Sequence, residues 1–266
     1  MSKFVVVIFP NETKAYDGVR ALKELHADGS LTVYGMAVIA KDGQGKVAVR
    51  DAADSGPLGT AAGALVGALV GIIGGPAAAL TGLAGGALIG SLWDLFSLGV
   101  GTDFIDKVSK ELVPGKTAII AEIAETWVTP LDTRMGALGG VVLRTWRADY
   151  EDEQIGREIA AAKVDYEQLN VEFKHARDEA KAKLKVRLDQ AKATLADTQR
   201  KAATRLEALE TEMTAKAAEL QKQLSGASAE AKAKLNQSLT ALRTDYATRS
   251  SKLKQAWTLT KDALAA

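Results

Sequence analysis

The sequence predicts an α+β protein: a ferredoxin-like head with an inserted glycine-zipper helical hairpin, followed by a long α-helical coiled coil. Three patterns indicate this fold class. Short β-branched apolar runs alternate with helical patterns over residues 1–147, and an uncharged glycine-rich segment interrupts them at 57–98. Residues 148–266 contain no proline and are rich in Ala, Lys, Glu and Leu. Each pattern has the periodicity of a different kind of secondary structure.

The head is predicted to have the element order βαββαβ. Apolar, β-branched runs of strand length occur at 4–9, 31–40, 46–49 and 117–124. The first helix has Asn11 as a typical N-cap, and a second helix precedes the fourth strand. This order is that of the split, ferredoxin-like arrangement. A short helix after Trp127 and a strand at 141–146 are expected to extend it.

The inserted segment carries no charged residue between Asp54 and Asp94. A helical glycine costs ~1 kcal/mol relative to alanine, so a regular series is tolerated where it lets two helices approach closely. We therefore predict two helices, 57–73 and 77–98, packed face to face as a hairpin. The predicted packing glycines recur every fourth residue in two series: Gly59, Gly63, Gly67, Gly71 and Gly75, then Gly82, Gly86 and Gly90.

The third region, 148–266, is predicted to be a coiled-coil stalk. From Ile155 to Leu224 its apolar stripe advances about 3.6 residues per step, which favours a nearly straight helical stalk over this range. The predicted seam residues are Ile155, Ile159, Tyr166, Leu169, Phe173, Leu184, Leu188, Leu195, Leu206, Leu209, Leu220 and Leu224. The hexapeptide EAKAKL occurs at 179–184 and again at 230–235. Residues 225–228 are either a turn that starts an antiparallel return or part of a continuous helix.

Composition argues against the common kinds of catalytic site. The formal net charge is +1, without the basic excess typical of nucleic-acid binding. There is no cysteine, and the two histidines, His26 and His175, have no motif around them. Gly115-Lys116-Thr117 imitates a phosphate loop, but Lys110 stands where that motif needs glycine. We expect no enzyme activity, no catalytic residue, no cofactor and no metal site.

The whole chain resembles an uncharacterised bacterial family, a numbered domain of unknown function whose members are often described as membrane proteins. The resemblance rests on five segments. They are KFVVVIFPNETKAYDGVRALKEL at 3–25, the glycine-rich 59–90, AEIAETWVTPLDTRMGALGG at 121–140, DEQI at 152–155 and DYATRSSKLKQAWTLTKDAL at 245–264. It implies membrane association and an unknown activity, and it supplies no catalytic residue.

Two functions are compatible with these patterns. The first is a membrane-associated oligomeric scaffold on the cytoplasmic side, at the inner face of the cell membrane, with copies of itself and lipid as partners. Hairpin arms of ~17–22 residues sit at the low edge of the ~17–25 residues that a membrane span needs. The alternative is a soluble self-assembling structural protein, a ring, tube or filament, in which the hairpins pack together as a protein core.

Overall fold

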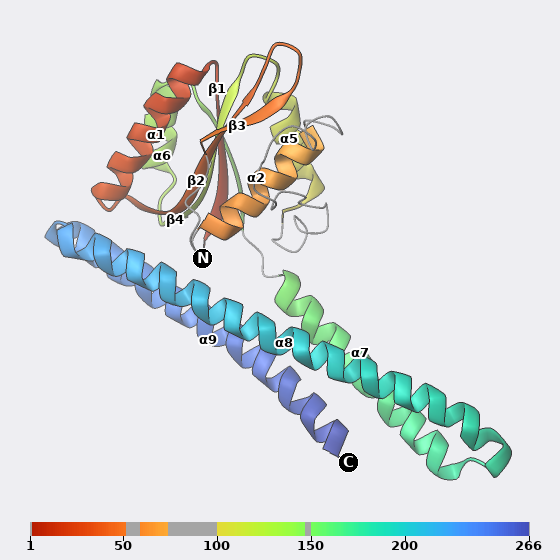
Figure 1. Cartoon of the computed structure of the whole chain (residues 1–266). Coiled ribbons are helices and arrows are strands. Elements are labelled where there is room, and N and C mark those ends of the chain that lie inside the picture. Colours follow the sequence, from red (N-terminus) through yellow and green to blue (C-terminus); the bar gives the residue numbers. More distant parts are fainter. Residues whose placement is uncertain (1, 52–58, 74–99, 147–149, 266) are drawn as a thin grey trace. The chain divides into compact units, whose positions relative to one another are not determined.

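The computed structural model describes residues 2–51, 59–73, 100–146 and 150–265 (Figure 1). By packing, the chain divides into two units: Met1–Asp149 with Thr214–Leu242, and Tyr150–Met213 with Arg243–Ala266. All of 148–266 was predicted to belong to the stalk. The structure instead groups 214–242 with the head.

The head is built on a five-stranded antiparallel sheet with the order β3-β2-β4-β1-β5. Its strands are β1 (Lys3–Phe9), β2 (Leu31–Lys41), β3 (Val47–Asp51), β4 (Thr117–Glu125) and β5 (Val141–Trp146). All five were predicted within two residues at each end. Every residue of β1 is buried, because β4 and β5 flank it and helices cover both faces of the sheet. This explains why β1 is a continuous apolar run rather than an alternating one.

Helices cover both faces of the sheet (Figure 1). The face that carries Val5 and Val7 is covered by α1 (Glu12–Ala27) and α6 (Thr129–Ala137). The face that carries Phe4 and Val6 is covered by α2 (Gly59–Ile73) and α5 (Thr102–Glu111). The alternation of side chains along β1 therefore feeds two separate apolar cores.

The predicted α+β class and element order are confirmed, but the ferredoxin-like arrangement is not observed. In a ferredoxin-like sheet the first and third strands are the central neighbours, and both helices lie on one face. Here β2 and β4 are the central neighbours of the four-strand unit, and the described helices lie on opposite faces. Strand order is fixed by long-range pairing, which local patterns do not report.

Residues 214–242 form a helical hairpin within the first unit. It joins the end of α8 (Asp178–Gly226) to the start of α9 (Ala229–Ala265). Leu220 packs against Leu235 and Leu239, so the two helices run antiparallel about the turn. Of the two alternatives left open by the sequence, the structure has the antiparallel return.

The second unit contains α7 (Tyr150–His175) together with the remaining parts of α8 and α9. Tyr166 of α7 packs against Leu195 of α8, which makes these two helices antiparallel as well. The prediction of one nearly straight helix through 155–224 is therefore wrong. The chain turns between α7 and α8, at Ala176 and Arg177.

Among the residues that the structure describes, no helix combines the length and the apolar composition needed to cross a membrane.

Gly18 of α1 allows the helix to lie close to the sheet. A Cβ at this position would overlap the ring of Phe9 and lie 3.0 Å from Ile119 Cδ1. We expect Gly18→Val to lower the free energy of unfolding by about 1–3 kcal/mol through overpacking. The matched control is Gly136→Ala in α6, where a Cβ meets no atom within 4 Å. That change is expected to be neutral or to stabilise by up to ~1 kcal/mol. Urea denaturation that found equal effects would contradict the close packing.

Candidate functional site: a polar docking site at one end of the sheet

The predicted packing glycines are only partly within the described structure. Gly59, Gly63, Gly67 and Gly71 lie in α2, whereas Gly75, Gly82, Gly86 and Gly90 lie outside the described residues. The apolar side chains Leu65 and Leu69 of α2 are fully buried against the sheet. Helix α2 therefore packs on the sheet of the head, and its pairing with a second glycine-rich helix stays a prediction.

The predicted seam residues are distributed over antiparallel contacts within the chain. Seven are buried: Ile155, Ile159, Tyr166, Leu169, Leu195, Leu209 and Leu220. Five are partly buried: Phe173, Leu184, Leu188, Leu206 and Leu224. The structure brings Ile155, Ile159, Leu206 and Leu209 into one cluster with residues of α9. The stripe thus serves packing among α7, α8 and α9 of one chain.

A buried ion pair joins the helical hairpin to the sheet. We call residues 214–242 the arm. Glu122 lies directly opposite Phe4 in the ladder of β4 and β1, so its side chain is on the same face of the sheet as the core residue Phe4. Its carboxylate accepts a hydrogen bond from Lys216 of the arm, and the two side chains are 0% and 4% exposed. The Lys216 ammonium also lies 4.8 Å from the centre of the Tyr34 ring.

Gln223, seven residues further along the arm, adds a second set of contacts. Its amide nitrogen donates to the carbonyl oxygens of Leu31, at 2.8 Å, and of His26. Its amide oxygen accepts from the Thr32 hydroxyl at 2.7 Å. Both donors of the amide and its acceptor are therefore engaged, which fixes the orientation of the arm on this end of the sheet.

His26 adds a third contact between the arm and the head, and its hydrogen bonds require the neutral form of its imidazole. Its Nδ1 accepts from the Val33 backbone N–H at 3.1 Å, so Nδ1 carries no proton, and Nε2 lies 3.3 Å from Glu219 of the arm. Burial lowers the pKa of His26 below its usual 6.5, an effect that Glu219 partly offsets and Lys222 reinforces. A second proton would remove the acceptor that Val33 uses.

We call His26, Leu31, Thr32, Tyr34 and Glu122 the socket. Gly29, just before β2, allows the arm to lie close to the head. A Cβ there would lie 2.7 Å from the Cβ of Ala231, and its φ of +77° suits glycine. The arm and the socket are therefore joined by a short, mostly polar interface within the first unit.

The opposite face of the sheet carries a second polar cluster at the same end. Glu125 accepts from Lys3 at 3.1 Å and from Arg144 at 2.7 Å. Arg144 also contacts Asp132 of α6 at 2.7 Å. Burial lowers the pKa of Arg144, but its bonds to Glu125 and Asp132 outweigh that effect and raise it above the ordinary value. These contacts tie β1, β4, β5 and α6 together.

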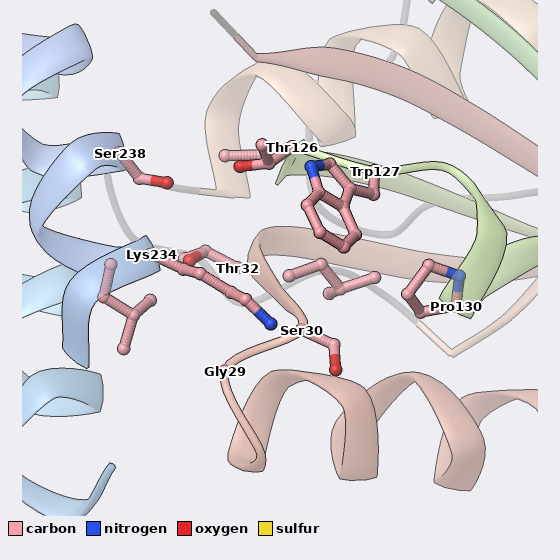
Figure 2. Close-up of a pocket in the computed structure, with 11 residues that line it drawn as sticks. Gly29, Ser30, Thr32, Thr126, Trp127, Pro130, Lys234 and Ser238 are labelled. Atoms are coloured by element: carbon pink, nitrogen blue, oxygen red, sulfur yellow. The ribbon is translucent and has the colours of Figure 1, made fainter. Parts of the chain in front are cut away.

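A small cavity lies beside the socket, and Figure 2 shows Trp127 and Lys234 facing it. The Lys234 ammonium is 5.4 Å from the centre of the Trp127 ring. The cavity encloses about 40 Å³, which is space for a few waters, whereas ligand pockets commonly enclose ~300–1,000 Å³. Over the described residues, no group of three or more His, Asp or Glu side chains is placed to hold a metal ion.

The second unit has its own buried polar contact. Asp152 of α7 accepts from Arg205 of α8 at 2.6 Å and from Arg249 of α9 at 2.7 Å. One carboxylate thereby links all three helices. Asp152 belongs to the DEQI segment at 152–155, one of the five segments that carry the family resemblance, but no role was predicted for it.

Sequence reasoning missed the socket and the arm. One signal was present, because Glu122 interrupts the apolar run of 117–124 and a charge inside a buried strand needs a partner. Lys216 and Gln223 gave no such signal, since they look like surface residues of a polar helix.

Comparison with known proteins adds one finding. Residues 60–160 match the model of a family described as "Protein of unknown function (DUF1269)". The match runs from α2 into α7, and over this segment it supports the resemblance to a family of unknown function. No match to the chain was found among curated proteins or among solved structures.

The neutral His26 predicts how the stability of the first unit depends on pH. Because its pKa is lowered on folding, the unfolded chain binds more protons below about pH 6.5, and stability falls as pH decreases through that range. We expect His26→Asn, which keeps an acceptor near the Val33 N–H, to flatten this part of the pH profile of urea unfolding. The exposed His175→Asn is the control and is expected to keep the slope. An unchanged slope in His26→Asn would contradict the assignment.

Proposed function

We propose that this chain is a non-catalytic, membrane-associated oligomeric scaffold. The observation that carries the proposal is the absence of charge between Asp54 and Asp94. So long an uncharged stretch is rare in a protein whose charged residues make up 25% of the chain. Its glycines at every fourth position suit close helix packing in lipid, and the resemblance to a family described as membrane proteins supports the same reading.

The other parts of the molecule fit a structural role. Two buried carboxylates of the head are engaged in contacts that hold elements together: Glu122 with Lys216, and Glu125 with Arg144. The helices α7, α8 and α9 carry many exposed acidic and basic side chains. We propose that the head and the helices act on the cytoplasmic side of the membrane, where they join copies of the chain.

An alkaline carbonate wash of membranes tests the proposal. We expect the unmodified chain to stay with the washed membranes. Gly71→Lys adds a charge at an exposed position of α2, where it leaves the head core intact. A lysine within a membrane span costs about 2.5–3.5 kcal/mol at the centre and less toward the end, so this variant, two residues from the end of the predicted helix, is expected to lose part of its membrane fraction to the supernatant. Gly71→Ala is the control and is expected to stay. If the unmodified chain and both variants are washed off the membranes alike, the membrane proposal is wrong.

A second candidate function is a soluble self-assembling structural protein. One observation favours it: Leu65 and Leu69 of α2 are fully buried against the chain's own sheet, so this apolar face is already covered by protein. On this proposal the hairpins of several copies pack together. The same fractionation distinguishes the two, because this candidate predicts large particles in the detergent-free supernatant whether or not Gly71 is changed to Ala.

A further inference from the structure

The turn between α7 and α8 brings a group of basic side chains together in the second unit. We call residues 173–188 the tip, because they contain the end of α7, the turn at Ala176 and Arg177, and the start of α8. The tip has six basic and two acidic residues, all of them exposed. The basic residues are Lys174, Arg177, Lys181, Lys183, Lys185 and Arg187. Since the whole chain has a net charge of +1, the remaining residues are acidic on balance, and the positive excess is local to the tip.

Few carboxylates neutralise these charges. Over the described part of the chain, two of the six basic side chains form ion pairs: Lys181 with Asp178 at 3.0 Å, and Lys185 with Asp189 at 3.6 Å. Both pairs are exposed to water, where an ion pair contributes little. The tip therefore presents a positive surface to its surroundings.

The second copy of the sequence repeat makes the same kind of turn without this charge. At the offset of 51 residues, the turn at 225–228 corresponds to 174–177. The counterparts of Lys174, Arg177, Lys185 and Arg187 in that copy are Ser225, Ser228, Asn236 and Ser238. The second copy also forms an antiparallel helix pair, in which Leu220 packs against Leu235. Neither the turn nor the helix pair therefore needs these four basic side chains, so their presence at the tip calls for another reason.

An exposed valine lies among the basic residues of the tip. Val186 is 58% exposed, and its counterpart in the second copy is Gln237. Because successive helical residues are about 100° apart, Lys185 and Arg187 lie on either side of Val186 on the outer surface of α8. An apolar side chain between two basic ones suits the headgroup region of a membrane, where the valine enters between the lipids and the basic groups reach the phosphates. A nucleic acid would attract the same charges, but it has no such use for the valine.

We infer that the tip binds the surface of a membrane that contains anionic phospholipids. The inference names the lipid class for the membrane part of the proposed function, on which it rests, and it assigns the contact to a surface separate from the uncharged segment. A basic side chain close to an anionic membrane strengthens binding about fivefold. The contact is peripheral and depends on salt, because exposed charges are screened.

Cosedimentation of the full chain with lipid vesicles tests the inference. Vesicles of phosphatidylcholine alone report binding through the uncharged segment, and the gain on adding phosphatidylglycerol reports the tip. We expect that gain for the unmodified chain, and we expect it to be lost between about 0.1 M and about 1 M salt, where the screening length falls from about 10 Å to about 3 Å.

The second copy of the repeat supplies the residues for the test variant. Its substitutions are Lys174→Ser, Arg177→Ser, Lys185→Asn and Arg187→Ser. We expect binding to the anionic vesicles to weaken on the order of tenfold or more, with an unchanged helix content by circular dichroism. The control removes the same number of exposed basic residues away from the tip: Lys232→Ser, Arg243→Ser, Lys252→Asn and Lys254→Ser. This control is expected to keep most of the gain.

A single substitution separates a lipid surface from other anionic partners. Val186→Gln leaves the charge unchanged, and it is expected to weaken binding to anionic vesicles a few-fold, because the lost side chain no longer enters the lipid. Its binding to a DNA duplex, used as a polyanion without lipid, is expected to stay the same.

The results that would overturn the inference leave the scaffold proposal in different states. If the unmodified chain and the test variant bind anionic vesicles equally, the tip makes no lipid contact, and the scaffold proposal is still decided by the carbonate wash. If the test variant loses binding to the DNA duplex but not to the vesicles, the partner of the tip is a nucleic acid. If the unmodified chain binds neither kind of vesicle, both the inference and the membrane proposal are wrong.

Discussion

The ion pair between Glu122 and Lys216 joins the helical hairpin 214–242 to the sheet of the first unit. β4 lies inside the sheet, where the neighbours of Glu122 in the strand, residues 118–121 and 123–124, are apolar, and Glu122 is fully buried among them. A buried carboxylate without a partner would be strongly destabilising. Lys216, 94 residues later in the chain, supplies that partner. The sheet end and the helical hairpin therefore depend on each other, and the hydrogen bonds of Gln223 set the orientation in which they meet.

This polar interface and the uncharged segment have different physical properties, and we propose different roles for them. The segment that contains α2 is apolar and favours burial in lipid or protein. The interface between arm and socket is polar and selective. The first suits attachment to lipid or protein, whereas the second fixes how the helical hairpin lies on the sheet of its own chain.

Local patterns predicted the elements but not how distant parts meet. The strand bounds and the Asn11 cap, whose side chain accepts from the Lys14 N–H at 2.9 Å, were predicted because they depend on neighbouring residues. The strand order and the socket depend on residues far apart and were missed. The turn at Ala176 was missed despite a signal: the EAKAKL repeat, offset by 51 residues, places the counterpart of the 225–228 turn at 174–177.

A double-mutant cycle on Glu122 and Lys216 tests the central claim most directly. Glu122→Leu and Lys216→Met each leave one buried charge without its partner, and each is expected to lower the free energy of unfolding by about 3–5 kcal/mol. In the double variant both charges are gone, so its loss is expected to be smaller than the sum of the two by ~1 kcal/mol or more. Strictly additive losses would show that the two residues do not interact, and the account of how the arm is held on the sheet would be wrong.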